Sequence, residues 1–241
     1  MTPRPHARTR RAALASLILA GASLITLPGC DPRTLFFFLQ PFDPMVAAKG
    51  PSLKGKKVVI LTHLESGAGE TYSDLSRDLT REFRSALKKN VKSIELVEID
   101  KVNAWTEAHP SWSDPTEAGK DFEANIVIFL DVATFQAADP KSRDLMEGTS
   151  NIHIHVWEYG KPKDSKGKEE RNEPKEWSQI YEEQADTTFP VRGPVPRDIG
   201  VSESAFKIKF LKLVATELSW HFIDHAPGDD IQDVKFNSSI Q

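Results

Sequence analysis

Four histidines stand in two pairs whose spacing suits metal binding. His153 and His155 lie two apart in a stretch that alternates apolar and polar residues, and His221 and His225 lie four apart in a helical stretch. Each spacing places two imidazoles on the same side of its element, which is an arrangement that zinc and copper sites use. A metal-binding protein or metal-dependent enzyme built on these four histidines is therefore one hypothesis for this chain.

The same histidines also fit a surface that contacts a partner, and the sequence favours this interpretation. A zinc protease of the His-Glu-x-x-His type needs glutamate directly after the first histidine, whereas Phe222 follows His221. The helix that carries His221 is expected to pack on the apolar face of the neighbouring strand. His153 and His155 would then point to the opposite face, so the two pairs would not meet.

Other catalytic patterns are not present in the sequence. No Gly-x-Ser-x-Gly elbow occurs. The loop at 65–71 has two glycines but lacks both the Walker lysine and the dinucleotide-binding spacing. Carboxylates near expected strand ends leave a hydrolase as a further alternative, and they are Glu65, Glu70, Asp131 and Asp139. We therefore expect a non-catalytic protein without a cofactor.

The single cysteine follows a secretion signal. Four arginines lie within the first 11 residues, and an apolar segment follows at 12–26. A basic start, a short apolar core and a small residue before a cut site describe an exported chain. The motif Leu27-Pro28-Gly29-Cys30 resembles a bacterial lipobox. The resemblance implies cleavage between Gly29 and Cys30, a diacylglycerol on the Cys30 thiol, and a place in the cell envelope facing the periplasm.

Two other interpretations of this N-terminus fit less well. A membrane-spanning helix needs about 20 apolar residues, and Pro28 ends a shorter run here. An ordinary signal peptide would leave Cys30 as a free thiol without an internal disulfide partner. Asp31 resembles an inner-membrane retention signal of enterobacterial lipoproteins. Other bacteria do not follow that rule reliably, so the choice between inner and outer membrane stays open.

Composition and charge describe an ordinary globular chain that is acidic overall. Of the 241 residues, 39% are hydrophobic and 27% are charged. Removal of the first 29 residues would take away four arginines and no acidic residue, which changes the formal net charge from −4 to −8. The remaining chain is long enough for one sizeable domain. Its acidic balance argues against nucleic acid as a partner and against a polybasic membrane patch.

The chain divides into four segments by composition. They are a signal peptide at 1–29, a lipidated tether at 30–55, a domain at 56–226 and a polar tail at 227–241. Prolines exclude regular structure from most of the tether. Its apolar stretch at 35–39 is expected either to pack on the domain or to enter the lipid interface. A charged insert at 161–176 interrupts the domain and is typical of a solvated hairpin tip.

Hydrophobic periodicity predicts the strands and helices of the domain. Buried or alternating runs predict strands at 57–64, 93–102, 124–132, 149–159 and 177–189. Apolar residues at helical spacing predict helices at 74–89 and from 202 or 204 to 224, with a short helix from Thr116. The first strand, helix and strand indicate a right-handed crossover with parallel pairing.

These elements predict an α/β fold, an α+β sandwich with a mixed sheet of about five strands and two main helices on one face. The alternation at 149–159 divides its residues between the two faces of the sheet. Ile152, Ile154 and Val156 are expected to face the helices. The residues expected to face away are Asn151, His153, His155 and Trp157.

The order of the elements also supports a family resemblance. The residues that carry it are the opening strand Val58-Val59-Ile60-Leu61, the strand that begins at Ala124, and a hairpin with Tyr159-Gly160 and Trp177-Ser178. The pattern resembles the periplasmic domain shared by TolB N-terminal domains, CsgG-like secretion lipoproteins and LpoB-type activators of penicillin-binding proteins. Members of that group mostly bind partners and catalyse nothing. The resemblance therefore implies a binding role in envelope assembly, cell-wall synthesis, secretion or transport.

The sequence thus predicts two contacts, a membrane contact through lipidated Cys30 and a protein contact through one face of the sheet. The residues of that face are Asn151, His153, His155 and Trp157. Aromatic residues with polar tips are enriched where proteins meet. Three occupants stay open for this face: the tether folded back on it, another envelope protein, or a second copy of the chain.

Overall fold

A computed structural model describes residues 45–68, 72, 74–137, 144–161, 174–197 and 202–226. All of these residues belong to the unit Met45–Gln241. Several predictions lie outside the described residues: the Gly29–Cys30 site, the stretch at 35–39, most of the insert at 161–176, and the tail at 227–241. In the part of the chain that is described, no helix is long and apolar enough to cross a membrane.

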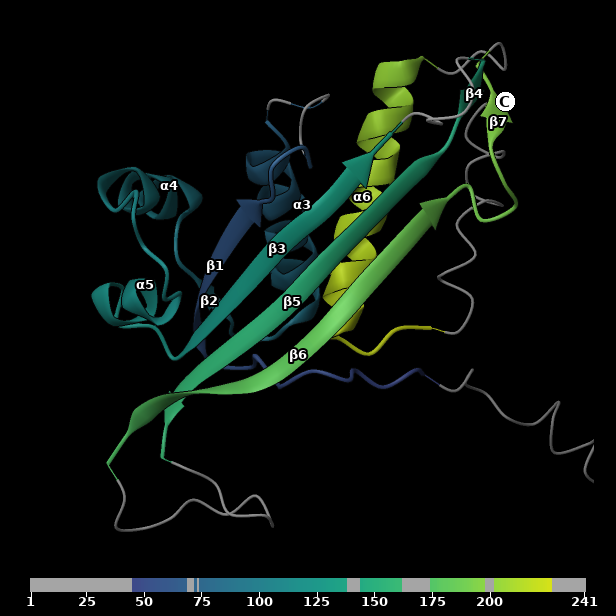
Figure 1. Cartoon of the computed structure of the whole chain (residues 1–241). Coiled ribbons are helices and arrows are strands. Elements are labelled where there is room, and N and C mark those ends of the chain that lie inside the picture. Colours follow the sequence, from purple (N-terminus) through teal and green to yellow (C-terminus); the bar gives the residue numbers. More distant parts are fainter. Residues whose placement is uncertain are drawn as a thin grey trace, which may run out of the picture. The chain divides into compact units, whose positions relative to one another are not determined.

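A mixed five-stranded sheet forms the centre of this domain (Figure 1). Its strands stand in the order β2 (Glu95–Leu96), β1 (Lys57–Leu64), β3 (Ile126–Gln136), β5 (Gly148–Gly160) and β6 (Glu176–Phe189). β1 runs parallel to β2 and β3, whereas β5 is antiparallel to both β3 and β6. A separate pair consists of β4 (Leu145–Met146) and β7 (Val195–Pro196). The predicted mixed α/β sheet is confirmed.

Two long helices, α3 (Leu75–Asn90) and α6 (Glu203–Trp220), cover one face of the sheet, as predicted. The apolar stripe of α3 is completely buried and consists of Leu75, Leu79, Phe83 and Leu87. Ile152, Ile154 and Val156 of β5 are equally buried and belong to the same core. The apolar half of the β5 alternation therefore faces these helices.

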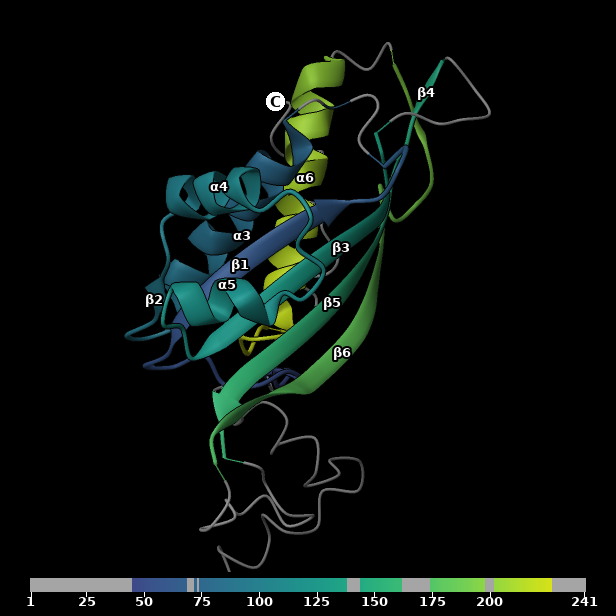
Figure 2. The same cartoon turned by 60° about the vertical axis from the view of Figure 1, so that its left-hand side comes forward.

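Two shorter helices, α4 (Ile99–Ala108) and α5 (Thr116–Asp121), cover part of the opposite face (Figure 2). Beneath them lies a second, smaller core that includes Val59, Leu61, Val102, Trp105, Ala118 and Val127. The sequence pattern predicted the two main helices on one face and did not predict this second layer. The layer matters for the site because it covers β1 and only the starts of β3 and β6.

The strand predicted at 93–102 is wrong beyond its first residues. β2 ends at Leu96, and α4 begins at Ile99. The guanidinium of Arg84 donates a hydrogen bond to the backbone carbonyl of Val97. This bond occupies an acceptor that a longer ladder with β1 would use. The segment then turns into a helix because its apolar residues follow a helical spacing across Val102 and Trp105.

Residues 45–55, the second part of the segment expected as a tether, lie against the end of α6. Leu53 is 1% exposed and belongs to the main core. Val46 and His225 form an antiparallel bridge, and the N–H of Gly50 donates to the carbonyl oxygen of His221 at 2.6 Å. This described part of the segment therefore packs beside the helix rather than over the outward side of β5.

Candidate functional site

The outward side of β5 presents the four residues that the sequence analysis expected there. Asn151, His153, His155 and Trp157 are each half-buried, and they alternate with fully buried apolar side chains. β5 lies between β3 and β6, so each of these residues has a cross-strand neighbour on both sides. Directly opposed residues in a sheet are close enough for their side chains to interact.

Phe129 of β3 lies at the centre of a group of rings on this side. His155 stacks on Phe129 at a centroid distance of 6.1 Å, and His63 of β1 stacks on it at 6.3 Å. Trp157 lies 6.5 Å from Phe129 and 5.8 Å from His155. His153 stacks on His155 at 6.5 Å. We refer to His63, Phe129, His153, His155 and Trp157 as the aromatic face.

Trp112, in the loop after α4, bounds the aromatic face on one side. Its ring meets Phe129 edge-on, at 5.7 Å and an interplanar angle of 89°. Trp105 packs beside Trp112 at 6.1 Å and donates its indole N–H to Oδ2 of Asp121 at 2.7 Å, which links α4 to α5. On this side of the sheet, no helix among the described elements lies over the middle of β5 and β6 (Figures 1 and 2).

Asp131 forms a close polar contact between β3 and β1 on the aromatic face. Its Oδ1 lies 2.8 Å from Nδ1 of His63. The register of β3 and β5 also places Asp131 directly opposite His153. One carboxylate therefore stands between two imidazoles, one on each neighbouring strand. This arrangement holds the His63 ring in place beside Phe129.

Two further carboxylates stand on β6, along the other side of β5. Oε1 of Glu182 lies 4.0 Å from Nδ1 of His155, and the Glu182 side chain is 66% exposed. Asp186 accepts a hydrogen bond from Nδ2 of Asn151 at 2.5 Å. Carboxylates therefore line the aromatic face on both β3 and β6.

The four histidines of the metal hypothesis do not come together. His221 belongs to the opposite side of the sheet, where its Nδ1 lies 2.8 Å from the hydroxyl of Tyr181. Burial lowers the pKa of His221. His225 stacks on Trp220 at 4.5 Å. Within the described ranges, no group of three or more His, Cys, Asp or Glu side chains is arranged to hold a metal ion.

The sequence analysis did not assign His63, Phe129 or Trp112 to a site. Phe129 lies in an apolar run that reads as buried on both faces, so its alternation does not reveal which side it occupies. His63 is a polar residue at the end of a similar run, which is the one local signal that was available. Their meeting with β5 depends on strand order, which no local pattern contains.

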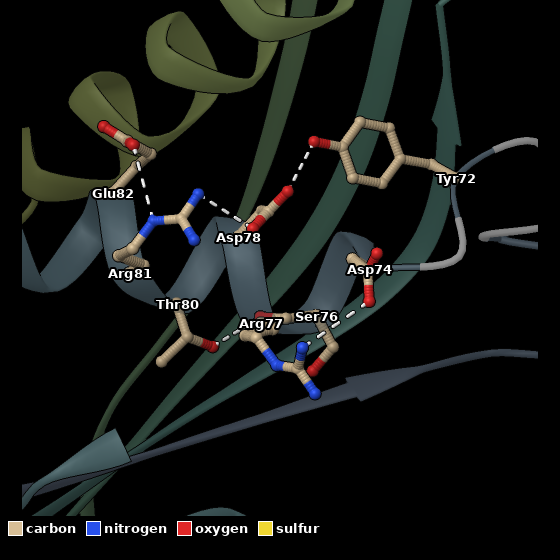
Figure 3. A network of polar contacts seen from close by, with 8 residues as sticks. All are labelled: Tyr72, Asp74, Ser76, Arg77, Asp78, Thr80, Arg81 and Glu82. Atoms are coloured by element: carbon tan, nitrogen blue, oxygen red, sulfur yellow. Dashed lines mark hydrogen bonds and ion pairs between the residues drawn. The ribbon is translucent and has the colours of Figure 1, made fainter. Parts of the chain in front are cut away.

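A polar network lies at the start of α3 (Figure 3), beside a cavity of about 490 Å³. The hydroxyl of Tyr72 donates to Oδ2 of Asp78 at 2.6 Å, and Asp78 pairs with Arg81 at 2.8 Å. Asp74 and Arg77 pair at 3.7 Å. Burial, together with the hydrogen bond to Asp78, raises the pKa of Tyr72 to about 12. These groups satisfy one another, so the network stabilises the first turns of the helix and presents no activated group.

No protein family and no curated protein matches the sequence. Solved structures similar to this chain include the PelC dodecamer from Paraburkholderia phytofirmans, with 9% identity over 76% of this chain and 98% of that chain and a TM-score of 0.37. Lipoprotein GNA1162 from Neisseria meningitidis has 10% identity over 70% and 99%, with a TM-score of 0.37. The LpoB C-terminal domain from Salmonella enterica has 10% identity over 58% and 87%, with a TM-score of 0.33. At these values the similarities assign neither a family nor a function.

Proposed function

We propose that this chain is a lipid-anchored protein of the bacterial cell envelope that binds another protein through the aromatic face and catalyses no reaction. The observation that supports binding is the ring group around Phe129, on the side of the sheet where no described helix covers the middle of β5 and β6. Aromatic side chains are enriched at protein interfaces, and a few of them contribute most of the binding energy. A plain solvated sheet face would instead present charged and small polar residues.

Protein binding is favoured over a metal-dependent function because the histidine pairs are separated. His155 stacks on Phe129 and His153 stacks on His155, whereas His221 contacts Tyr181 on the opposite side of the sheet. Two imidazoles on one strand supply only half of the ligands that a tetrahedral zinc site uses. Metal analysis of the purified protein distinguishes the two functions. Stoichiometric zinc or copper that is lost in both His153→Ala and His221→Ala would contradict the proposal.

Membrane attachment is proposed through Cys30, on the resemblance of the segment before it to a lipobox. Two or more acyl chains hold a protein stably on a membrane, whereas a single chain does not. Metabolic labelling with a fatty-acid analogue is expected to label the wild-type protein and not Cys30→Ser. The Cys30→Ser protein is also expected to leave the membrane fraction. Labelling or membrane association that persists in this variant would contradict the anchor.

Photo-crosslinking tests the binding surface directly. A photoreactive amino acid at position 155 is expected to give a crosslinked product with another envelope protein in intact cells. Position 85 provides the matched control, because Ser85 is exposed on α3, away from the aromatic face. A folded protein that yields the same products from both positions, or none from position 155, would remove this face as the binding surface.

A covering tether gives a different result. Removal of residues 31–44 spares Leu53, which is part of the core. If the deleted residues cover the aromatic face, the deletion exposes Trp157, shifts tryptophan emission to longer wavelength and lowers stability. The proposal expects unchanged emission and stability. Crosslinks from position 155 within one chain would assign the face to the tether instead.

A further inference from the structure

The charges around the aromatic face have one sign. Asp131, Glu182 and Asp186 all stand on the same side of the sheet as His155. The positions of β5 from Asn151 to Trp157 that face this side have cross-strand partners on β3 and β6. Among these positions and their partners, the described chain has no lysine and no arginine. A partner protein that covers them therefore meets negative charge, and a negatively charged partner would be repelled.

None of the three carboxylates is neutralised by a lysine or arginine among the described residues. Glu182 accepts a hydrogen bond from Nε2 of Gln179 at 2.9 Å, and Asp186 accepts from the amides of Asn151 and Gln184. The contact of Asp131 is with His63, as described above. Neutral amides orient Glu182 and Asp186 but do not cancel their charge, which leaves both able to pair with an incoming cation.

The carboxylates flank the rings on two sides. Glu182 on β6 is opposite His155 of β5. Asp131 on β3 is opposite His153, which lies two residues before His155 on β5. Neighbouring strands lie about 4.8 Å apart. A planar cation resting on the rings of β3 and β5 is therefore within side-chain reach of Asp131 on β3 and of Glu182 on β6. Guanidinium groups stack on aromatic rings and bind carboxylates through two parallel hydrogen bonds, which ammonium groups do not.

We infer that the aromatic face binds an arginine-bearing segment of its protein partner, with guanidinium groups stacked on Phe129 and Trp157 and paired with Glu182 and Asp131. This inference rests on the proposed protein-binding function and adds the chemistry of the partner. It requires that the affinity depend on both the rings and the carboxylates.

Fluorescence anisotropy with a labelled oligo-arginine peptide tests the inference on the full-length protein in neutral detergent. We expect binding that weakens with salt and that is tighter for oligo-arginine than for oligo-lysine. Glu182→Gln should weaken binding about two- to fivefold, the effect of one exposed ion pair. Trp157→Ala should weaken it about two- to fivefold through loss of the stacked ring.

The control removes one negative charge elsewhere. The control variant is Glu95→Gln. Glu95 is exposed and lies on β2, at the opposite edge of the sheet from β6. This variant should bind the peptide like the wild type. Equal affinity for oligo-lysine, or equal weakening in Glu95→Gln and Glu182→Gln, would overturn the inference because the binding would then reflect net charge. Glu182→Gln keeps the size of an exposed side chain and is expected to fold. It therefore tests the inference even if Trp157→Ala does not fold.

The crosslinked partner separates failure of the inference from failure of the proposed function. Crosslinks from position 155 to a surface with arginine support both. Crosslinks to a surface without arginine, or to a second copy of the chain, overturn the inference and leave a protein-binding face. Absence of crosslinks together with absence of peptide binding overturns both.

Discussion

The indole of Trp177, at the start of β6, packs directly against the backbone of Gly119 in α5. A Cβ atom at position 119 would lie 2.5 Å from two carbons of the indole and 2.7 Å from a methyl carbon of Val127. No side chain fits in this space without displacing the ring or the strand. The contact joins the smaller helical layer to the edge strand, beside the aromatic face.

Gly119→Ala is therefore expected to destabilise the domain. The added methyl group overpacks the contact with Trp177, and overpacking in a closed core costs about 1–3 kcal/mol. The measurement is the free energy of unfolding in urea. Gly160→Ala is the matched control, since a Cβ atom at position 160 has no atom within 4 Å. An equally small effect of both substitutions would contradict the packing of α5 on β6.

A charged side chain introduced into the main core from α3 or α6 is expected to destabilise the domain. Leu79 on α3 and Val214 on α6 are at most 1% exposed, and both lie in the main core. Leu79→Asp or Val214→Asp should lower the free energy of unfolding by about 3–5 kcal/mol, because each variant buries a charge without a partner. Ser85→Asp, at an exposed position of the same helix as Leu79, should change it by at most about 0.5 kcal/mol. Thermal unfolding that is unchanged in both core variants would refute this packing.

The elements of the main core could be predicted because their patterns are local. The spacing from Leu75 to Leu87 is helical, and the alternation at Ile152, Ile154 and Val156 is that of a strand with one buried face. α4 was missed because Val97 extends an apolar run that reads as a strand. The hydrogen bond from Arg84 that takes up the Val97 carbonyl joins residues thirteen apart and is not visible in a window of sequence.

The candidate site could be predicted only in part, for a similar reason. The outward residues of β5 follow from alternation along one strand, so His155 and Trp157 were expected. Phe129 and His63 join them because β3 stands between β1 and β5 in the sheet. Strand order is set by the packing of the whole domain, and several orders satisfy the same local patterns.

The hydroxyl of Tyr72 is expected to stabilise the start of α3. Tyr72→Phe removes the hydrogen bond to Asp78 while the ring keeps its edge contact with Phe135 at 6.3 Å. The loss should be about 0.5–1.5 kcal/mol in urea unfolding. Tyr159→Phe is the control, because Tyr159 is 44% exposed. A cost for Tyr159→Phe as large as that for Tyr72→Phe would contradict a role for the Tyr72 hydrogen bond.

Alkaline pH tests the same hydrogen bond. The folded pKa of Tyr72 is raised from 10.0 to about 12, so the folded state favours the protonated phenol. The stability that this provides is present below pH 10 and is lost as the pH rises toward 12. The wild type and Tyr72→Phe should therefore approach each other in stability over this range. A constant difference would contradict the assignment.

His221 should make the domain less stable in acid. Burial lowers its pKa below the ordinary value of 6.5, with Glu183 opposing this shift and Lys49 adding to it. The unfolded chain therefore binds a proton at a higher pH than the folded chain does. Stability is full above pH 6.5 and falls as the pH drops from there toward the folded pKa.

His221→Gln removes this proton-binding group, so the variant should lose less stability than the wild type between pH 7 and about pH 5. The measurement is the free energy of unfolding at each pH, and the slopes of the two proteins against pH are compared. If the free energies of unfolding of His221→Gln and the wild type fall equally as the pH drops, the burial of His221 beside Tyr181 does not contribute to acid sensitivity.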